Sequence, residues 1–140
     1  MLSLIIDTNS LISALIRDSS ARKILFYPQF VFHAPAHLLD EIILHFEEVA
    51  KKSGFGEDET NLLFNFLTSY ISFYPLSAFK DHLDEATSLT SDPDDVEFLA
   101  LALAIPNDGI WTADQHFEEQ KKIKIWKTAD LLKLLPQNEI

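Results

Sequence analysis

Residues 2–10, Leu-Ser-Leu-Ile-Ile-Asp-Thr-Asn-Ser, are the stretch that decides the fold class. Leu2 to Ile6 form a short apolar run, which predicts a strand buried on both faces rather than an alternating surface strand. Residues 7–10 are all of types that cap the N-terminus of a helix. The stretch therefore predicts a buried strand that leads directly into a helix.

The rest of the chain continues this alternation. Further strands are predicted at 30–33, 71–74, 110–112 and 124–126. Helices are predicted at 11–16, 21–26, 36–52, 57–70, 79–89, 96–105, 113–120 and 129–135, with Ser91-Asp92-Pro93 leading into the helix at 96 and Thr128 as the cap of the last one. Strands that alternate with helices indicate an α/β fold, with a mainly parallel sheet covered on both faces.

The composition indicates one globular domain without disulfides. A chain of 140 residues, 47% of them apolar, is long and apolar enough for a packed core. The absence of cysteine excludes thiolate metal sites and predicts a reducing, cytoplasmic setting. No apolar run reaches the roughly 20 residues that cross a membrane, and the first residues lack the basic region of a signal peptide. We therefore expect no membrane association.

The charge is strongly acidic, with 11 basic and 22 acidic residues and a net charge of −11. A general nucleic-acid coat protein is usually basic, so the balance argues against that class. A nuclease remains possible if divalent cations or a few basic side chains offset the acid locally. The candidates for phosphate contacts are Arg17, Arg22, Lys23, Lys51 and Lys52.

Polar side chains gather near the predicted carboxyl ends of the strands, where ligands bind in open parallel sheets. Asp7 directly follows the first strand, and Asp114 follows the strand at 110–112. The wider set is Asp7, Asn9, Glu41, Asp92, Asp94, Asp95, Thr112 and Asp114. Taken singly, Asp7 and Asp114 could be helix caps, capping is the favoured interpretation of Asp92, and Glu41 is typical of a helix surface.

Capping explains one acid for each helix, but not several acids at one sheet edge. Anions buried together are unfavourable unless they are compensated, and a cation would compensate them. Oxygen ligands select Mg²⁺ or Mn²⁺, which activate water and neutralise charge on a phosphodiester transition state. The set therefore predicts metal-dependent hydrolysis of phosphodiesters.

One competing pattern could hold zinc. His37, Glu41 and His45 recur every four residues and would form a stripe on one helical face. A solvated helix flank is the favoured interpretation, because a zinc site there would leave the other carboxylates unexplained. The remaining histidines, His33 and His82, have no evident partners.

Four motifs occur in one order along the chain: Asp7-Thr8-Asn9 after the first strand, Glu41 in a helix, the segment Asp95 to Ala102, and the segment Thr112 to Phe117. Together they resemble the PIN domain family over essentially the whole chain. The resemblance implies one domain over residues 1–135, a three-layer sandwich with a mainly parallel sheet of about four to five strands, and a short tail at 136–140. It also implies Mg²⁺- or Mn²⁺-dependent cleavage of single-stranded RNA.

Matched position by position, the resemblance implies these acidic catalytic residues and metal ligands: Asp7, Glu41, Asp95 and Asp114. Asn9 and Thr112 would support them through hydrogen bonds, and Asp94 could assist. Many family members carry Asp or Asn where this chain has His116, which leaves the second metal position open, although histidine can also bind Mn²⁺.

The resemblance also implies partners. Small free-standing prokaryotic members are commonly the toxin of a toxin–antitoxin pair of the VapC type, bound by a small DNA-binding antitoxin and often homodimeric. A non-catalytic PIN-like module that binds protein or RNA is the alternative. A phosphatase of the haloacid-dehalogenase type would need an acid where Asn9 stands, and a receiver domain would need one near Pro75, so both fit poorly.

Overall fold

Five parallel strands form the sheet of the computed structural model, which describes residues 1–16 and 19–136. The strands are β1 (Leu2–Ile6), β2 (Phe30–Pro35), β3 (Ile71–Tyr74), β4 (Ile110–Trp111) and β5 (Ile125–Trp126). Their order across the sheet is β3-β2-β1-β4-β5, and every neighbouring pair is parallel. The predicted α/β class with a parallel sheet is therefore confirmed.

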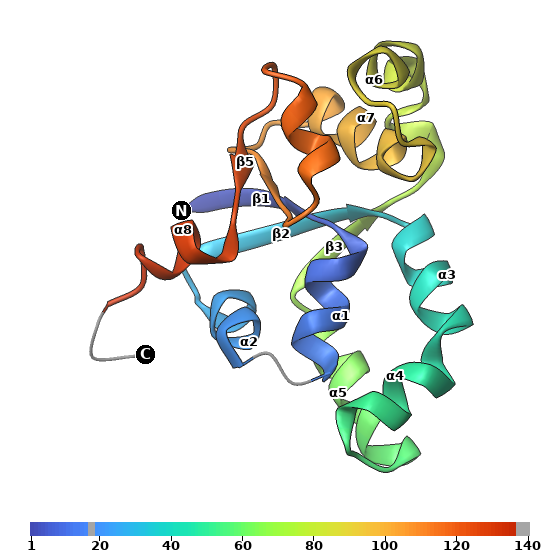
Figure 1. Cartoon of the computed structure of the whole chain (residues 1–140), viewed down its shortest axis with the longest axis vertical. Helices are drawn as coiled ribbons and strands as arrows, with labels where there is room; N and C mark the ends of the chain where they lie inside the picture. Colours follow the sequence, from blue (N-terminus) through green and yellow to red (C-terminus); the bar gives the residue numbers. More distant parts are fainter. Residues whose placement is uncertain (17–18, 137–140) are drawn as a thin grey trace.

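Helices cover both faces of this sheet. They are α1 (Thr8–Ile16), α2 (Ser19–Phe26), α3 (His37–Leu44), α4 (Phe46–Ser53), α5 (Glu57–Thr68), α6 (Leu83–Leu89), α7 (Val96–Ala104) and α8 (Thr128–Leu132). Short 3₁₀ turns are η1 (Leu76–Ala78), η2 (Lys80–His82), η3 (Pro93–Asp95) and η4 (Gln115–Glu119). Figure 1 shows α6 and α7 on one face and α1, α2 and α5 on the other, so the sheet is the middle of three layers.

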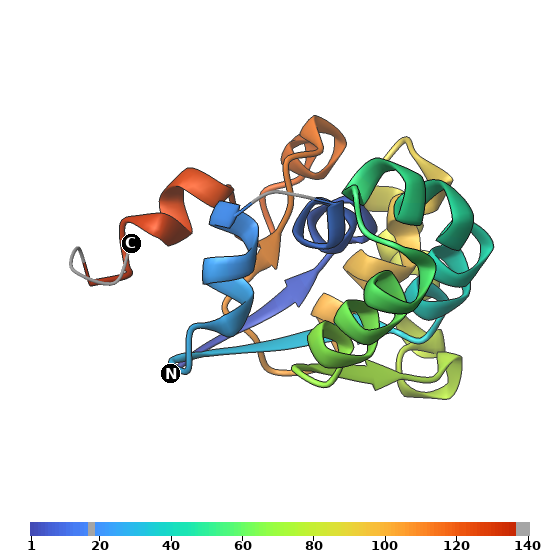
Figure 2. The same ribbon diagram turned by 90° about the horizontal axis from the view of Figure 1, so that it is seen from below.

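The central strand β1 sets the position of the functional edge. Its residues Leu4, Ile5 and Ile6 are fully buried, as expected for a strand with neighbours on both sides and helices on both faces. The chain passes from β1 to β2 and β3 on one side and then crosses to β4 and β5 on the other. Figure 2 shows the strands running in one direction, toward α3. The change of side lies between β1 and β4, where open α/β sheets bind ligands.

Helix α7 is the most deeply buried helix element next to that edge. Its residues Phe98 to Ala102 are all buried, which agrees with the alanine- and leucine-rich sequence. Asp92 begins the segment: its Oδ1 accepts a 3.0 Å hydrogen bond from Asp94 N, and Pro93 occupies the first position of η3. The predicted start at Ser91-Asp92-Pro93 is thus confirmed, with a 3₁₀ turn before the α-helix.

Two of the predicted helices are interrupted. The single helix predicted at 36–52 is wrong, because His45 leaves the helical conformation (φ −105°, ψ 13°) and separates α3 from α4. The helix predicted at 79–89 is also wrong in its first turn. Phe79 adopts φ −136° and ψ 7°, which buries its ring in the core and leaves two 3₁₀ turns before α6. Tertiary packing thus accounts for the break at Phe79.

The last elements are shorter than predicted. The segment at 113–120 is the 3₁₀ turn η4 rather than an α-helix, and the final helix covers Thr128–Leu132 rather than 129–135. Thr128 is not its cap: Lys127 holds that position, and Lys127 N donates to Asp130 Oδ2 at 3.0 Å. The Thr128 hydroxyl instead accepts a 3.1 Å hydrogen bond from Trp111 Nε1. Residues 137–140 of the predicted tail lie outside the described part.

Across residues 1–16 and 19–136, none of the helices has the length and apolar character needed to span a membrane.

Candidate metal centre

A small acidic pocket lies at the carboxyl ends of β1 and β4. Its volume is about 190 Å³, enough for a hydrated cation and too little to enclose a nucleotide with it. It is lined by Asp7, Thr8, Asn9, Glu41, Asp92, Asp94, Asp95, Phe98, Asp114 and Phe117. These side chains come from β1 and α1, from α3, from η3 and α7, and from η4, so four separate stretches of the chain meet there.

Asp7 forms the wall at the end of β1 and is only 4% exposed. Its Oδ1 accepts a 2.8 Å hydrogen bond from Ser10 N and so caps α1, while its Oδ2 accepts a 2.5 Å hydrogen bond from the Thr112 hydroxyl. Burial raises the pKa of Asp7 even though these hydrogen bonds favour the ionised form. Asp7 therefore caps α1 and lines the pocket at the same time.

Thr112 connects the two strand ends. Its hydroxyl donates to Asp7 and accepts a 3.0 Å hydrogen bond from Asp114 N, directly after β4. The side chain is 1% exposed, so water does not compete for these contacts. Thr112 thus fixes the carboxylate after β1 relative to the backbone after β4.

Asp95 is the most unusual group in the pocket. It is 5% exposed, and its Oδ2 is buried with no hydrogen-bond partner among the described residues. Burial, together with the negative charges of Asp114 and Asp92, raises the pKa of Asp95 to about 7. A buried carboxylate without a partner is costly. The ionised form of Asp95 therefore requires a compensating positive charge, and the charge of His116 offsets the neighbouring carboxylates only in part.

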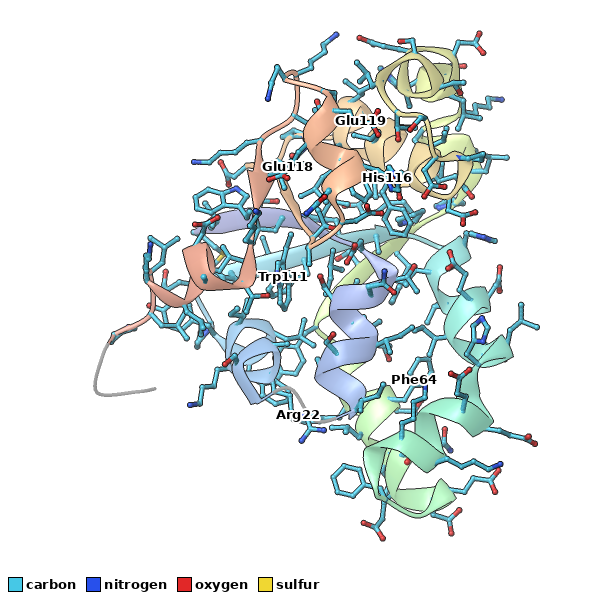
Figure 3. All side chains as sticks on the ribbon, in the orientation of Figure 1. Arg22, Phe64, Trp111, His116, Glu118 and Glu119 are labelled. Atoms are coloured by element: carbon cyan, nitrogen blue, oxygen red, sulfur yellow. The ribbon has the colours of Figure 1, made fainter. Side chains whose placement is uncertain are left out.

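Asp95 belongs to a four-donor cluster made of Asp92, Asp95, Asp114 and His116. Each residue offers one donor atom, and these atoms lie within 4.8 Å of one another. His116, labelled in Figure 3, extends from η4 toward η3, where its Nδ1 lies 3.0 Å from Asp114 Oδ1 and 3.6 Å from Asp92 Oδ2. Clustered carboxylates repel one another unless a proton or a cation lies between them.

A divalent cation fits these residues. The donors are carboxylate oxygens and one imidazole, and the unpartnered Oδ2 of Asp95 is an orphaned polar atom that a cation would satisfy. Hard divalent ions take carboxylate ligands, often with several waters retained, and the pocket has room for such waters. The residues that would hold the ion are Asp95 and Asp114, with Asp7, Glu41, Asp92 and His116 around them.

A family model described as the PIN domain matches residues 5–135, which include every residue that lines the pocket. The chain belongs to the PIN domain family. PIN domains are generally nucleases that need divalent metals, and the acidic cluster is compatible with that requirement. Among curated proteins, none matches the chain.

In this PIN domain, the carboxylates that the resemblance singled out line one pocket but hold different positions in it. Glu41 lies at the side, where its Oε2 accepts a 3.2 Å hydrogen bond from the Thr8 hydroxyl, and it is outside the four-donor cluster. Asn9 and Asp94 line the pocket from its exposed rim. Asp7 is also outside the cluster, and its two oxygens accept hydrogen bonds from Ser10 N and the Thr112 hydroxyl.

Asp92 was the residue that the sequence pattern did not single out as a ligand. The structure bears out capping, because Asp92 Oδ1 accepts from Asp94 N, yet its Oδ2 lies on the side of His116. A carboxylate has two oxygens, so one can cap a helix while the other faces a site. The signal was its place in the same turn as Asp95, three residues earlier.

The histidines of the PIN domain differ in their surroundings. The zinc pattern does not form a site in the described residues: His37 Nε2 lies 3.5 Å from Glu41 Oε1, whereas His45 Nδ1 lies 3.8 Å from Glu48 Oε2. The expectation that His33 has no partner is wrong. Its Nε2 is hydrogen-bonded to Ser3 Oγ at 2.8 Å and its Nδ1 to Tyr74 OH at 2.9 Å, across β1, β2 and β3.

Among the described basic residues proposed for phosphate contacts, which are Arg22, Lys23, Lys51 and Lys52, none lines the pocket. Arg22 Nε donates to Ala14 O at 2.5 Å, and its guanidinium lies 5.8 Å from the Phe55 ring. Figure 3 places Arg22 far from His116, on the other side of the sheet. Lys52 pairs with Glu48 on α4. Arg17 lies outside the described residues. Bound cations, rather than these basic side chains, are therefore the groups that could offset the negative charge of the pocket.

Proposed function

We propose that this PIN domain is a Mg²⁺- or Mn²⁺-dependent endoribonuclease that hydrolyses phosphodiester bonds of single-stranded RNA, leaving a 5′-phosphate and a 3′-hydroxyl. The observation that carries the proposal is the buried, unpartnered Oδ2 of Asp95 within a cluster of carboxylates at the switch point of the sheet. Structural carboxylates are normally hydrogen-bonded. A desolvated one that faces other acids is typical of a cation site at a ligand-binding edge.

Each residue has a distinct role in the proposal. Asp95 and Asp114 hold the cation, and Asp7 and Glu41 complete its surroundings, in part through water. A divalent cation held there would supply an activated water and would offset the negative charge that builds on the phosphate. Thr112 holds the Asp7 carboxylate in one rotamer. Through its hydrogen bond from Asp114 N, it also fixes the start of η4 relative to that carboxylate. Asn9, on the rim, is placed to donate a hydrogen bond to a phosphate oxygen.

The acidic surface remains compatible with an RNA substrate. The pocket is too small to enclose a nucleotide, so a single strand would lie across its mouth and present one phosphate to the cation. Attraction then comes from the metal and not from a basic face. This predicts binding that depends strongly on the divalent ion and weakly on bases far from the pocket.

The direct test is cleavage of a mixed pool of single-stranded RNA by the purified protein in Mn²⁺, Mg²⁺ or EDTA. Asp95→Asn is the inactive variant, and Asp81→Asn, an exposed site in η2, is the charge-matched control. We expect cleavage in either metal, at least about a hundredfold less in Asp95→Asn, and no change in Asp81→Asn. Equal cleavage by both variants would contradict the proposal.

A protein partner is the second part of the proposal: a homodimer, and a small antitoxin that blocks this protein as the toxin of a pair. The support is an apolar surface on α3 and α5, where Leu44 is 82% and Leu62 is 70% exposed. A groove includes Leu44 from this surface. It is lined by Ile42, Ile43, Leu44, Phe64, Glu47, Glu57, Asp58 and Asn61. Phe64 is labelled in Figure 3. Exposed apolar patches of this kind mark protein contacts.

In the sequence, Leu63, Phe66, Leu67 and Tyr70 recur at a spacing that predicts one apolar helical face. Phe66 and Tyr70 from this set are exposed, which extends the apolar surface. Light scattering on the wild type and on Leu44→Glu/Leu62→Glu tests the dimer: we expect the variant alone to be monomeric. A monomeric wild type would contradict the proposed homodimer.

Growth arrest on expression, relieved by Asp95→Asn, tests the toxin. Expression of the wild type without growth arrest would contradict the proposed toxin.

The alternative is a PIN domain that binds protein or RNA without catalysis. A calorimetric Mn²⁺ titration separates the two, because a module with a decayed site should not take up the ion. For either function we propose a cytoplasmic setting and one domain over residues 1–135, on the strength of the absent cysteines and the matched range.

A further inference from the structure

His116 and Asp92 face each other at the outer side of the pocket. His116 lies in η4, and its imidazole is 54% exposed. Its Nδ1 nevertheless points at two carboxylates of the pocket, Asp114 at 3.0 Å and Asp92 at 3.6 Å. The donor that this chain places there is therefore nitrogen.

We propose that His116 and Asp92 join Asp95 and Asp114 as ligands of the cation, and that the imidazole makes the site prefer Mn²⁺ to Mg²⁺. The inference rests on the proposed function, since the same cation would serve phosphodiester cleavage. It goes further in naming two ligands outside the expected set of Asp7, Glu41, Asp95 and Asp114, and in deciding between the two metals.

Two independent observations support this ligand set. The first is distance: one donor atom from each of the four residues lies within 4.8 Å of the others, close enough to share one ion. The second is the Oδ2 atom of Asp95: the residue is 5% exposed, and this one oxygen is buried without a hydrogen-bond partner among the described residues. Acidic residues can cluster without a metal, but a desolvated oxygen without a hydrogen-bond partner inside the cluster is an independent observation that favours a bound cation.

Anchoring of the donors also favours the proposal. Asp92 Oδ1 is held by Asp94 N, and the Asp114 carboxylate is held by His116 N at 2.9 Å. These bonds orient each carboxylate, so that little side-chain freedom is lost when an ion binds. The same turn of η4 that orients Asp114 also sets the direction of the imidazole.

The selectivity follows from the ligand chemistry. Mg²⁺ demands near-octahedral oxygen ligands and gives up its waters reluctantly, so exchanging an oxygen for an imidazole weakens it. Transition-metal ions accept imidazole, and Mn²⁺ also accepts the three carboxylates. The chain has no cysteine to add a soft ligand. A mixed site with mostly oxygen donors and one nitrogen therefore suits Mn²⁺ better than Mg²⁺.

The test uses the metal alone and the full-length protein. Mn²⁺ binding is followed by electron paramagnetic resonance, with Mg²⁺ as competitor, and pulsed measurements detect nitrogen bound to Mn²⁺. We expect nitrogen coupling in the wild type and its loss in His116→Asp. The preference for Mn²⁺ over Mg²⁺ should fall by about tenfold in that variant. In Asp92→Asn, Mn²⁺ affinity should fall while the nitrogen coupling remains.

His45→Asp is the matched control, since His45 is 59% exposed and outside the four-donor cluster. It should leave the coupling and the preference unchanged. Mn²⁺ bound without nitrogen coupling, or an unchanged preference in His116→Asp, would overturn the inference while RNA cleavage could still support the nuclease. Nitrogen coupling in a protein that never cleaves RNA would uphold this site and remove the proposed activity.

Discussion

The Thr112 hydroxyl donates a 2.5 Å hydrogen bond to Asp7 Oδ2, across 105 positions of sequence and between the ends of β4 and β1. The same hydroxyl accepts from Asp114 N. One buried side chain thus connects the ends of the two strands at which the sheet changes its direction of crossover, and it holds the Asp7 carboxylate and the backbone amide of Asp114.

We expect Thr112→Val to weaken both the fold and the metal site. Valine keeps the shape but leaves a buried oxygen of Asp7 and the amide of Asp114 without their partner. The free energy of unfolding should fall by about 1–3 kcal/mol, and Mn²⁺ affinity by about 10–100-fold. Urea unfolding and calorimetric titration measure the two effects. Thr112→Ser, which retains the hydroxyl, is the control and should stay close to wild type in both.

Asp95→Asn should stabilise the metal-free protein while it abolishes metal binding. The substitution removes a buried charge that faces Asp92 and Asp114 and has no partner for Oδ2. At pH 8 in EDTA, we expect the free energy of unfolding to rise by roughly 1–3 kcal/mol. The increase in melting temperature that Mn²⁺ gives the wild type should disappear. A metal-free variant less stable than Asp81→Asn would contradict this account of Asp95.

The stability of the metal-free protein should fall as the pH rises from about 4 to about 7. The pKa of Asp95 is raised from 3.8 to about 7, so in that interval the folded state holds a proton that the unfolded state has lost. The raised pKa of Asp7 acts in the same sense. The contribution of protonated Asp95 to stability is fully present below about pH 4. It is lost as the pH rises through the pKa of Asp95 in the folded protein, about 7.

Urea unfolding in EDTA at a series of pH values checks this dependence. Burial lowers the pKa of His33, which acts in the opposite sense and reduces stability as the pH falls below about 6.5. The difference between the free energies of unfolding of wild type and Asp95→Asn isolates the pH dependence that Asp95 causes, because both proteins contain His33. Identical pH profiles for the two proteins would show that Asp95 titrates alike in the folded and unfolded states.

Gly109 should tolerate no side chain. Its φ is +133°, and a Cβ there would lie 2.4 Å from Lys124 O and 2.8 Å from the Trp126 ring. We expect Gly109→Ala to lower the free energy of unfolding by about 2–5 kcal/mol, because β4 and β5 must separate to make room. Gly56→Ala is the matched control: its Cβ would meet Glu59 Oε1 at an ordinary 3.6 Å, so it should be neutral or mildly stabilising. Thermal unfolding of the two variants compares them directly.

The sequence by itself determined the fold class and the candidate acids. The apolar run 2–6 is followed by four capping residues, and the alternation of such runs with helical patterns predicts a parallel α/β sheet. These signals are local, because burial of a strand and capping of a helix depend on residues only a few positions apart. The break at Phe79 was missed for the same reason, since this residue is buried in the core that distant segments form, and the break at His45 was missed as well.

Only the tertiary structure decided how the acids share the pocket. Asp7, which directly follows the first strand, has both oxygens held by protein hydrogen bonds, while Asp92, which looked like a simple cap, turns one oxygen toward His116. It also decided that Asp95 is buried without a partner for Oδ2. Such facts depend on which oxygen of each carboxylate faces which neighbour. That is fixed when β1, β4 and the start of α7 pack together, and no spacing along the chain encodes it.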